Sequence, residues 1–94
     1  MKVGVLTVRL RLSSPTSLKE KRSILKHLIA GIRHKFSVSV AEIDHHDDKR
    51  AATLGIACLA NDGRFVHRLL SKVLSHCNGA ADCSVEEVQL EVWP

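Results

Sequence analysis

The alternation of apolar and polar side chains predicts four β-strands. From Leu6 to Leu12 every second residue is apolar, which is the pattern of a strand with one buried face. Shorter stretches with the same alternation recur in the middle and at the end of the chain. The expected strands cover residues 2–12, a segment that begins near Phe36 or Ser37 and ends before residue 44, residues 50–60, and residues 87–92.

Apolar residues at helical spacing predict two helices. The first begins at a capping box, in which the Ser17 hydroxyl accepts the backbone N–H of Glu20 and the Glu20 carboxylate reaches back, and it runs to about Lys35. The second follows Asp62 as its N-cap and stops at Asn78-Gly79. The expected buried stripes are Leu18, Leu25, Leu28, Ile29, Ile32 and Phe36 on the first helix, and Phe65, Val66, Leu69, Leu70, Val73, Leu74 and Cys77 on the second.

The order strand, helix, strand, strand, helix, strand predicts a ferredoxin-like βαββαβ sandwich of the α+β class. With 94 residues, the chain is expected to form a single domain, residues 1–94. Right-handed crossovers place both helices on one face of a four-stranded antiparallel sheet with strand order 4-1-3-2. The first and last strands then lie side by side, which allows ion pairs between them. The expected partners are Arg9 and Arg11 on one strand, and Glu87 and Glu91 on the other.

Two longer motifs and three shorter matches suggest a family. The longer motifs are Ser17-Leu18-Lys19-Glu20-Lys21-Arg22-Ser23 with Leu25-Lys26, and Phe36-Ser37-Val38-Ser39-Val40-Ala41-Glu42. The shorter matches are Thr53-Leu54-Gly55, Asp62 and Lys72-Val73. With these motifs the chain resembles, over nearly its whole length, the YlxP-like family of bacterial domains of unknown function.

The resemblance implies a ferredoxin-like fold and no established activity. In some bacteria the genes of this family lie among those for transcription elongation, translation initiation and ribosome maturation, which implies a role near RNA. The chain departs from the family where a Leu-Trp pair usually stands near the start of the third strand, because Asp48-Lys49 occupies that place.

Composition excludes several classes of protein. Hydrophobic residues make up 45% of the chain and charged residues 26%, which is ordinary for a globular domain and unlike a disordered or collagen-like chain. No apolar run approaches the roughly 18 residues of a membrane span, and the first residues lack the apolar stretch of a signal peptide. A cytoplasmic location is therefore expected.

Positive charge is concentrated in the first part of the chain. The net charge is +4, but residues 1–40 carry nine Lys and Arg against one acidic residue, whereas residues 41–94 carry five against nine. An asymmetry of this kind favours a polyanionic partner, such as RNA or a ribosomal particle. A solvated helix surface is the alternative explanation.

The basic residues form rows on both expected helices. On the first helix Lys19, Arg22 and Lys26 lie at i, i+3 and i+7, and cations recur every four residues on the second. The first turn of the first helix also offers backbone N–H groups to a phosphate. The candidate phosphate-binding residues are Lys19, Lys21, Arg22, Lys26, Arg33, Arg64, Arg68 and Lys72, of which the first four are expected to make the main contacts.

The sheet face away from the helices is expected to be mostly small and apolar. A contiguous patch of this kind usually marks an interface, so a homodimer through the sheet is expected. The candidate interface residues are Val5, Thr7, Ala41, Ile43, Thr53, Ala57 and Leu59. Because the expected central strands carry no aromatic residue, base stacking on this face is not expected. The rival function is a homodimeric interaction module, or a small-ligand regulatory module, that uses this face.

No motif in the chain indicates an enzyme or a cofactor, because Walker A, dinucleotide-binding, nucleophile-elbow and zincin patterns are absent. The run His45-His46-Asp47-Asp48 contains metal-ligating side chains, but no second cluster completes a site, so a polar turn is expected. The three cysteines form no Cys-x-x-Cys pair. Cys77 and Cys83 flank a short loop and are expected to remain thiols, with a disulfide as the alternative.

Overall fold

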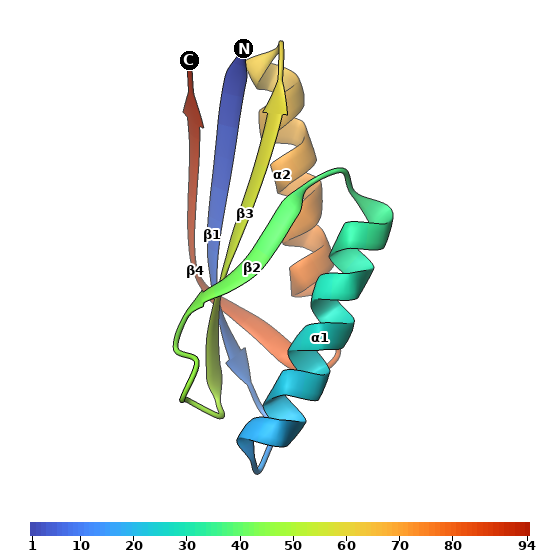
Figure 1. Cartoon of the computed structure of the whole chain (residues 1–94), viewed down its shortest axis with the longest axis vertical. Helices are drawn as coiled ribbons and strands as arrows, with labels where there is room; N and C mark the ends of the chain where they lie inside the picture. Colours follow the sequence, from blue (N-terminus) through green and yellow to red (C-terminus); the bar gives the residue numbers. More distant parts are fainter.

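Four antiparallel strands form a single sheet. In the computed structural model of residues 1–94, the strands are β1 (Lys2–Leu12), β2 (Ser39–Asp44), β3 (Ala51–Ala60) and β4 (Cys83–Trp93). Their order across the sheet is β2-β3-β1-β4 (Figure 1). This is the predicted order 4-1-3-2 read from the other edge, so the prediction of a ferredoxin-like α+β fold is confirmed.

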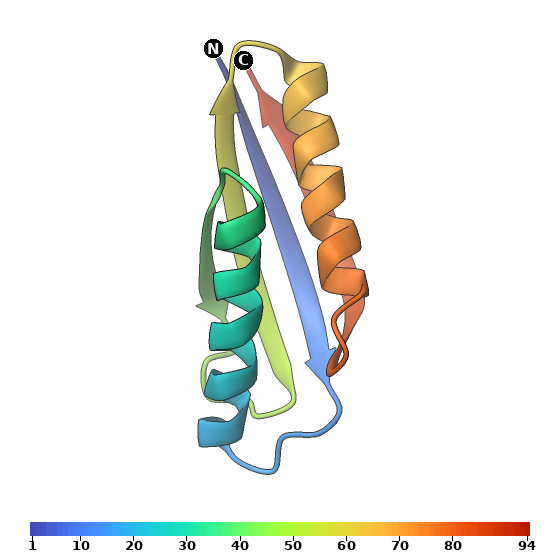
Figure 2. The ribbon, with the colours of Figure 1, turned by 90° about the vertical axis from the view of Figure 1, so that its right-hand side faces the viewer.

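Two helices, α1 (Leu18–Lys35) and α2 (Gly63–Asn78), cover one face of the sheet. They run in opposite directions and are staggered along the long axis, with α1 in the lower half and α2 in the upper half of Figure 2. The opposite face of the sheet has no helix over it, since both helices lie to the right of the strands in Figure 1. Neither helix is long and apolar enough to cross a membrane.

Side-chain caps determine where both helices begin. Ser17 Oγ accepts the backbone N–H of Glu20 at 3.1 Å, as the capping box predicts. The Glu20 carboxylate reaches back past Ser17 and accepts the backbone N–H of Thr16 at 2.8 Å and the Thr16 hydroxyl at 3.0 Å. Asp62 caps α2 as predicted, because its Oδ1 accepts the backbone N–H of Arg64 at 2.8 Å.

β2 begins at Ser39 rather than near Phe36 as expected. Phe36 is the C-cap of α1, and its N–H donates to the carbonyl of Ile32 at 2.9 Å. The N–H of Val38 then donates to the carbonyl of Phe36 at 3.0 Å and closes a turn. The chain therefore leaves the helix and changes direction within three residues, although their side chains alternate as in a strand.

β4 begins at Cys83, whereas the alternating pattern predicts a start near residue 87. The pattern misses the first part of the strand because a β-bulge interrupts the alternation. The pairing of β4 with β1 shifts register between Arg9 and Leu10, with Glu86 as the extra residue of β4. This insertion interrupts the period of two, so Val85 and Val88, three residues apart, both pair with core-facing residues of β1. β4 changes direction near this point (Figure 1).

The core lies between the sheet and the helices. Every second residue of β1 from Leu6 to Leu12 is buried, as the alternation predicts. Phe65 was expected in the buried stripe of α2 but is 52% exposed, because it lies about 100° around the helix from buried Val66. The helix residues that are buried are Lys21, Leu25, Leu28 and Ile32 on α1, and Val66, Leu70, Val73 and Cys77 on α2.

α2 approaches β1 most closely at Gly4. A Cβ atom built on Gly4 would lie 2.1 Å from Cγ1 of Val66 and 2.8 Å from Cδ1 of Leu70. Both distances are far below van der Waals contact, so the helix occupies space that a side chain at this position would need. Gly4 therefore sets how closely α2 packs against the sheet.

Candidate nucleic-acid interface

The two helices carry most of the positive charge of the molecule. Together α1 and α2 contain nine Lys and Arg residues and one acidic residue, Glu20. The rest of the chain contains five Lys and Arg residues and nine acidic residues. Because both helices lie on one face of the sheet (Figure 2), charge is separated by layer, with the cations in the helix layer.

A row of exposed cations follows one side of α1. Lys19, Arg22 and Lys26 are exposed, and none of them takes part in an ion pair. Arg33 continues the row, and its guanidinium donates a hydrogen bond to the carbonyl of Val40 in β2 at 2.9 Å. The row therefore runs along the side of α1 next to β2.

Lys21 lies beneath α1, and the prediction that it contacts phosphate is wrong. Its side chain is 1% exposed, with Nζ 3.0 Å from Oε2 of Glu42 and 2.6 Å from the carbonyl oxygen of His45. The contact with Glu42 has the distance of an ion pair without the geometry of a directed hydrogen bond. Lys21 thus ties α1 to β2 and to the turn after it, and a phosphate group cannot reach its ammonium.

The turn between β2 and β3 is organised around His45. This residue has a φ of 66°, a left-handed conformation that is uncommon outside glycine. Its backbone N–H donates to Oδ1 of Asp44, and its Nδ1 lies 2.8 Å from Oγ1 of Thr53. Thr53 is 8% exposed, so its side chain lies on the predicted face of the sheet but is covered by His45 and is not free to contact a partner. No group of three or more His, Cys, Asp or Glu side chains is placed to hold a metal ion.

The second row of cations lies on α2. Arg64, Arg68 and Lys72 are all exposed, and only Arg64 has an acidic neighbour, with Nε 3.7 Å from Oδ1 of Asp62. α2 itself contains no acidic residue. These three residues therefore lie on the surface of the helix layer, as predicted.

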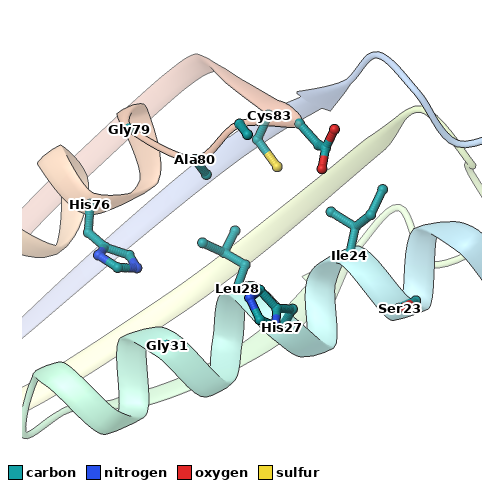
Figure 3. A pocket seen from close by; sticks show the side chains of 11 residues that line it. Ser23, Ile24, His27, Leu28, Gly31, His76, Gly79, Ala80 and Cys83 are labelled. Atoms are coloured by element: carbon teal, nitrogen blue, oxygen red, sulfur yellow. The ribbon is translucent and has the colours of Figure 1, made fainter.

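A groove of about 770 Å³ lies beside α1, next to the end of α2 and the loop that leads to β4 (Figure 3). Leu28 and Ile24 point into it from α1, and the His76 ring points toward α1 from the last turn of α2 (Figure 3). The His76 ring also packs edge-on against Phe36, with 5.8 Å between the ring centroids. None of the eight predicted cations lines this groove. The rows on α1 and α2 are therefore two separate strips rather than one continuous surface.

The first turn of α1 keeps the backbone N–H groups of Leu18 and Lys19 without an acceptor, as expected, but it also carries the Glu20 carboxylate beside them. The N–H groups of Thr16 and Glu20 are taken by the Glu20 carboxylate and the Ser17 hydroxyl. The hydrogen bond from the Thr16 backbone holds the pKa of Glu20 below its ordinary value, so its negative charge is present at neutral pH. A phosphate at this position would meet that carboxylate.

The arginines of β1 are neutralised by β4. Arg9 lies 3.9 Å from Glu87, as predicted. Arg11 pairs with Glu86 rather than with Glu91, because the bulge inserts Glu86 beside it. The hydrogen bond from Arg11 lowers the pKa of Glu86 and raises the pKa of Arg11. Glu91 instead accepts hydrogen bonds from the side chains of Gln89 and Trp93.

All seven predicted interface residues lie on the open face of the sheet, and six of them are exposed or half-buried there. Ile43 lies directly over Gly55, where an added Cβ would be 3.1 Å from Cγ2 of Ile43. Ile43 and Leu59 are 53% and 65% exposed. The six residues are Val5, Thr7, Ala41, Ile43, Ala57 and Leu59.

The cysteines are three free thiols. Burial raises the pKa of Cys77 to about 11, and burial also raises the pKa of Cys58 and Cys83. A raised pKa keeps a thiol protonated at neutral pH, so none of the three is an activated nucleophile.

Comparisons with known proteins give a family and a fold. A sequence profile described as "Protein of unknown function (DUF503)" matches residues 3–90. The "Uncharacterized protein YlxP" of Bacillus subtilis (strain 168) is 36% identical over 59 residues, which cover 63% of this chain. The match spans 64% of that relative, slightly less than two thirds of its length.

Three solved structures resemble the chain in fold. The cofactor-independent oxygenase SnoaB from Streptomyces nogalater has 11% identity and a TM-score of 0.51, with 99% of this chain and 91% of that chain covered. The de novo designed protein Foldit4 has 18% identity and a TM-score of 0.52, with 100% and 98% covered. The ACT domain from GTP pyrophosphokinase of Chlorobium tepidum has 11% identity and a TM-score of 0.51, with 95% and 96% covered. Similarity at these identities shows a shared fold alone.

Proposed function

The chain belongs to the DUF503 family of proteins of unknown function, and we propose that it is a non-catalytic, cytoplasmic factor that binds the phosphate backbone of RNA through its helix layer. The observation that supports this function is the separation of charge by layer, with eight exposed cations and one carboxylate on the two helices, because the ninth cation, Lys21, is buried. The ribosome is the proposed setting, because the family resemblance implies a role near RNA.

The exposed row on α1 supplies the main contacts in this proposal. Lys19, Arg22 and Lys26 have no acidic partner, so their charges are available to phosphates without the loss of an internal ion pair. Arg33 continues the row, and Arg64, Arg68 and Lys72 form a second strip on α2. Spaced cations of this kind bind a backbone by releasing its counterions, which makes the affinity fall steeply with salt.

The test measures the affinity of the protein for ribosomal RNA and for a short DNA duplex across a series of salt concentrations. The Lys19→Glu, Arg22→Glu, Lys26→Glu triple variant should bind RNA at least tenfold more weakly. The slope of log affinity against log salt should fall by about two to three units, since each phosphate contact contributes about 0.7 to 0.9. Circular dichroism of the variant checks that it remains folded.

A matched control changes the net charge by the same amount outside the helix layer. It reverses Lys2, Lys49 and Arg50 to glutamate, and it should bind RNA with nearly the wild-type salt slope. Equal losses of RNA affinity in both triple variants would mean that net charge alone determines binding, which would contradict the proposed surface. RNA binding that is equally strong at high salt would favour the rival ligand-binding module instead.

A further inference from the structure

No helix covers the face of the sheet away from α1 and α2 (Figure 1), although the turn after β2 reaches over part of it, where His45 covers Thr53. We propose that this face binds a second copy of the chain, packed sheet against sheet about a two-fold axis that runs along the strands. The proposal rests on the register and relief of the sheet and is independent of RNA binding. Its failure would leave the proposed function of the helix layer untouched.

The strand register places the apolar residues of the open face at one end. In the first row across the sheet, Val3 of β1 lies between Leu59 of β3 and Trp93 of β4. Leu59 is 65% exposed and Trp93 is 50% exposed, so the row presents large apolar side chains to solvent. In the next row, Val5 lies between Ala57 of β3 and Glu91 of β4. A contiguous apolar surface of this kind on a soluble protein usually forms an interface.

The same face has a ridge beside a hollow. Val3, Val5 and Thr7 form the ridge along β1, and the small residues Ala57 and Gly55 of β3 lie beside them. Two cavities, of about 560 Å³ and about 310 Å³, follow these small residues and continue onto β2. A ridge of β-branched side chains and a hollow of similar length therefore lie one strand apart.

A two-fold axis that runs along the strands between β1 and β3 places β1 of each copy over β3 of the other copy. The ridge of each copy then lies over the hollow of the other, with Val5 against the second copy's Ala57 and Thr7 against the Ile43 side chain that covers its Gly55. An axis across the strands would instead stack each strand on itself, with ridge against ridge along β1. The relief of the face therefore favours the axis along the strands.

The size of the face fits a second copy better than a small molecule. The molecule measures 43 Å along its long axis and 16 Å along its shortest axis, which is the width of the sheet in Figure 2. The product of these two dimensions, roughly 700 Å², is an upper bound on the footprint and approaches the roughly 800 Å² per partner of a standard protein interface. A small ligand would leave most of the apolar rows exposed. At the other end of the face, Arg9 and Arg11 form ion pairs with glutamates of their own copy, so packing of two copies leaves neither arginine unpaired.

The test is the mass of the protein in solution, measured by sedimentation equilibrium over a range of concentrations. The wild type should be a dimer. Ala57→Arg, which fills the hollow, and Leu59→Lys, at an exposed strand end, should each raise the dissociation constant at least a hundredfold. Arg68→Glu on the helix layer is the matched surface control and should leave the dimer intact. A monomeric wild type, or a dimer unaffected by both sheet variants, would overturn the proposal.

Cross-linking checks the direction of the axis. With the axis along the strands, residue 59 of each copy lies in the same row as residue 59 of the other. With the axis across the strands, the two lie at opposite ends of the sheet. Leu59→Cys on a Cys83→Ser background should therefore be joined across the dimer by a short bismaleimide. A dimer that resists this reagent would overturn the proposed arrangement.

Discussion

Lys19 and Lys21 lie two residues apart on α1 and have opposite environments. Lys19 is exposed without an acidic partner, whereas Lys21 is buried against Glu42 and the carbonyl of His45. A buried ion pair adds little net stability, but removing one partner leaves the other charge buried without compensation. Lys21 therefore matters to the fold, and Lys19 is free to serve a surface function.

This difference predicts the stability of lysine variants. Lys21→Ala should lower the free energy of unfolding by about 3 kcal/mol, because Glu42 would remain buried without its partner. Lys19→Ala should change it by less than about 0.5 kcal/mol, as exposed substitutions usually do. The Lys21→Met, Glu42→Leu double variant should lose less than Lys21→Ala. Urea titrations measure all three, and equal stability of the two single variants would contradict the buried role.

The burial of Lys21 could have been predicted from its position. Lys21 precedes Leu25 by four residues and Leu28 by seven, so it lies on the apolar stripe of the helix. Glu42 lies two residues after Val40, so both side chains point to the same, core-facing side of the strand. The left-handed backbone of His45, in contrast, left no recognisable pattern in the sequence. It follows from the contacts of its N–H with Asp44 and of its ring with Thr53.

At the scale of elements, the contact of α2 with β1 depends on the missing side chain of Gly4. The alternation of β1 predicts that position 4 faces the core, and the sequence does not show that α2 fills the space beside it. Similarly, the alternation around residues 87–92 predicts the second part of β4, while the bulge at Glu86 conceals the first. Local patterns thus reveal elements, and contacts between distant segments set their ends and spacing.

Gly4→Ala should lower the free energy of unfolding by about 1 to 3 kcal/mol, the usual cost of overpacking a core. The new methyl group would overlap Cγ1 of Val66, which is held close to the helix backbone and has little freedom to move away. Gly31→Ala is the control, because a Cβ there would meet His76 at an ordinary 3.5 Å. Within α1 that alanine should stabilise the protein by up to about 1 kcal/mol. Thermal unfolding of both variants would show whether Gly4 is as restricted as the packing indicates.

At the scale of the whole molecule, the predicted topology and strand order are correct, whereas the candidate basic face is only partly so. Helix periodicity correctly predicts the exposed rows on α1 and α2, but it cannot show how the helices are staggered. The structure places the α1 row next to β2 and a groove beside the other flank of α1. Residues far apart in the sequence line that groove, so no local motif indicates it.

The two proposed surfaces should respond differently to salt. Higher salt should weaken RNA binding steeply, because phosphate contacts depend on counterion release. The sheet-to-sheet dimer should keep its affinity or bind more tightly, because its centre is apolar and its charges are paired within each copy. Filter binding with RNA and sedimentation of the free protein, over the same salt series, measure the two responses. A dimer that dissociates as steeply as the RNA complex would contradict an apolar interface.

The separation of charge by layer also gives the molecule a permanent electric dipole across its thickness. In the field of a polyanion this dipole experiences a torque that turns the helix layer forward before any contact forms. Collisions are then enriched in the orientation that places Lys19, Arg22 and Lys26 first. In a dimer packed through the sheets, the two dipoles point in opposite directions and cancel, so both outer faces attract a polyanion and neither is preferred.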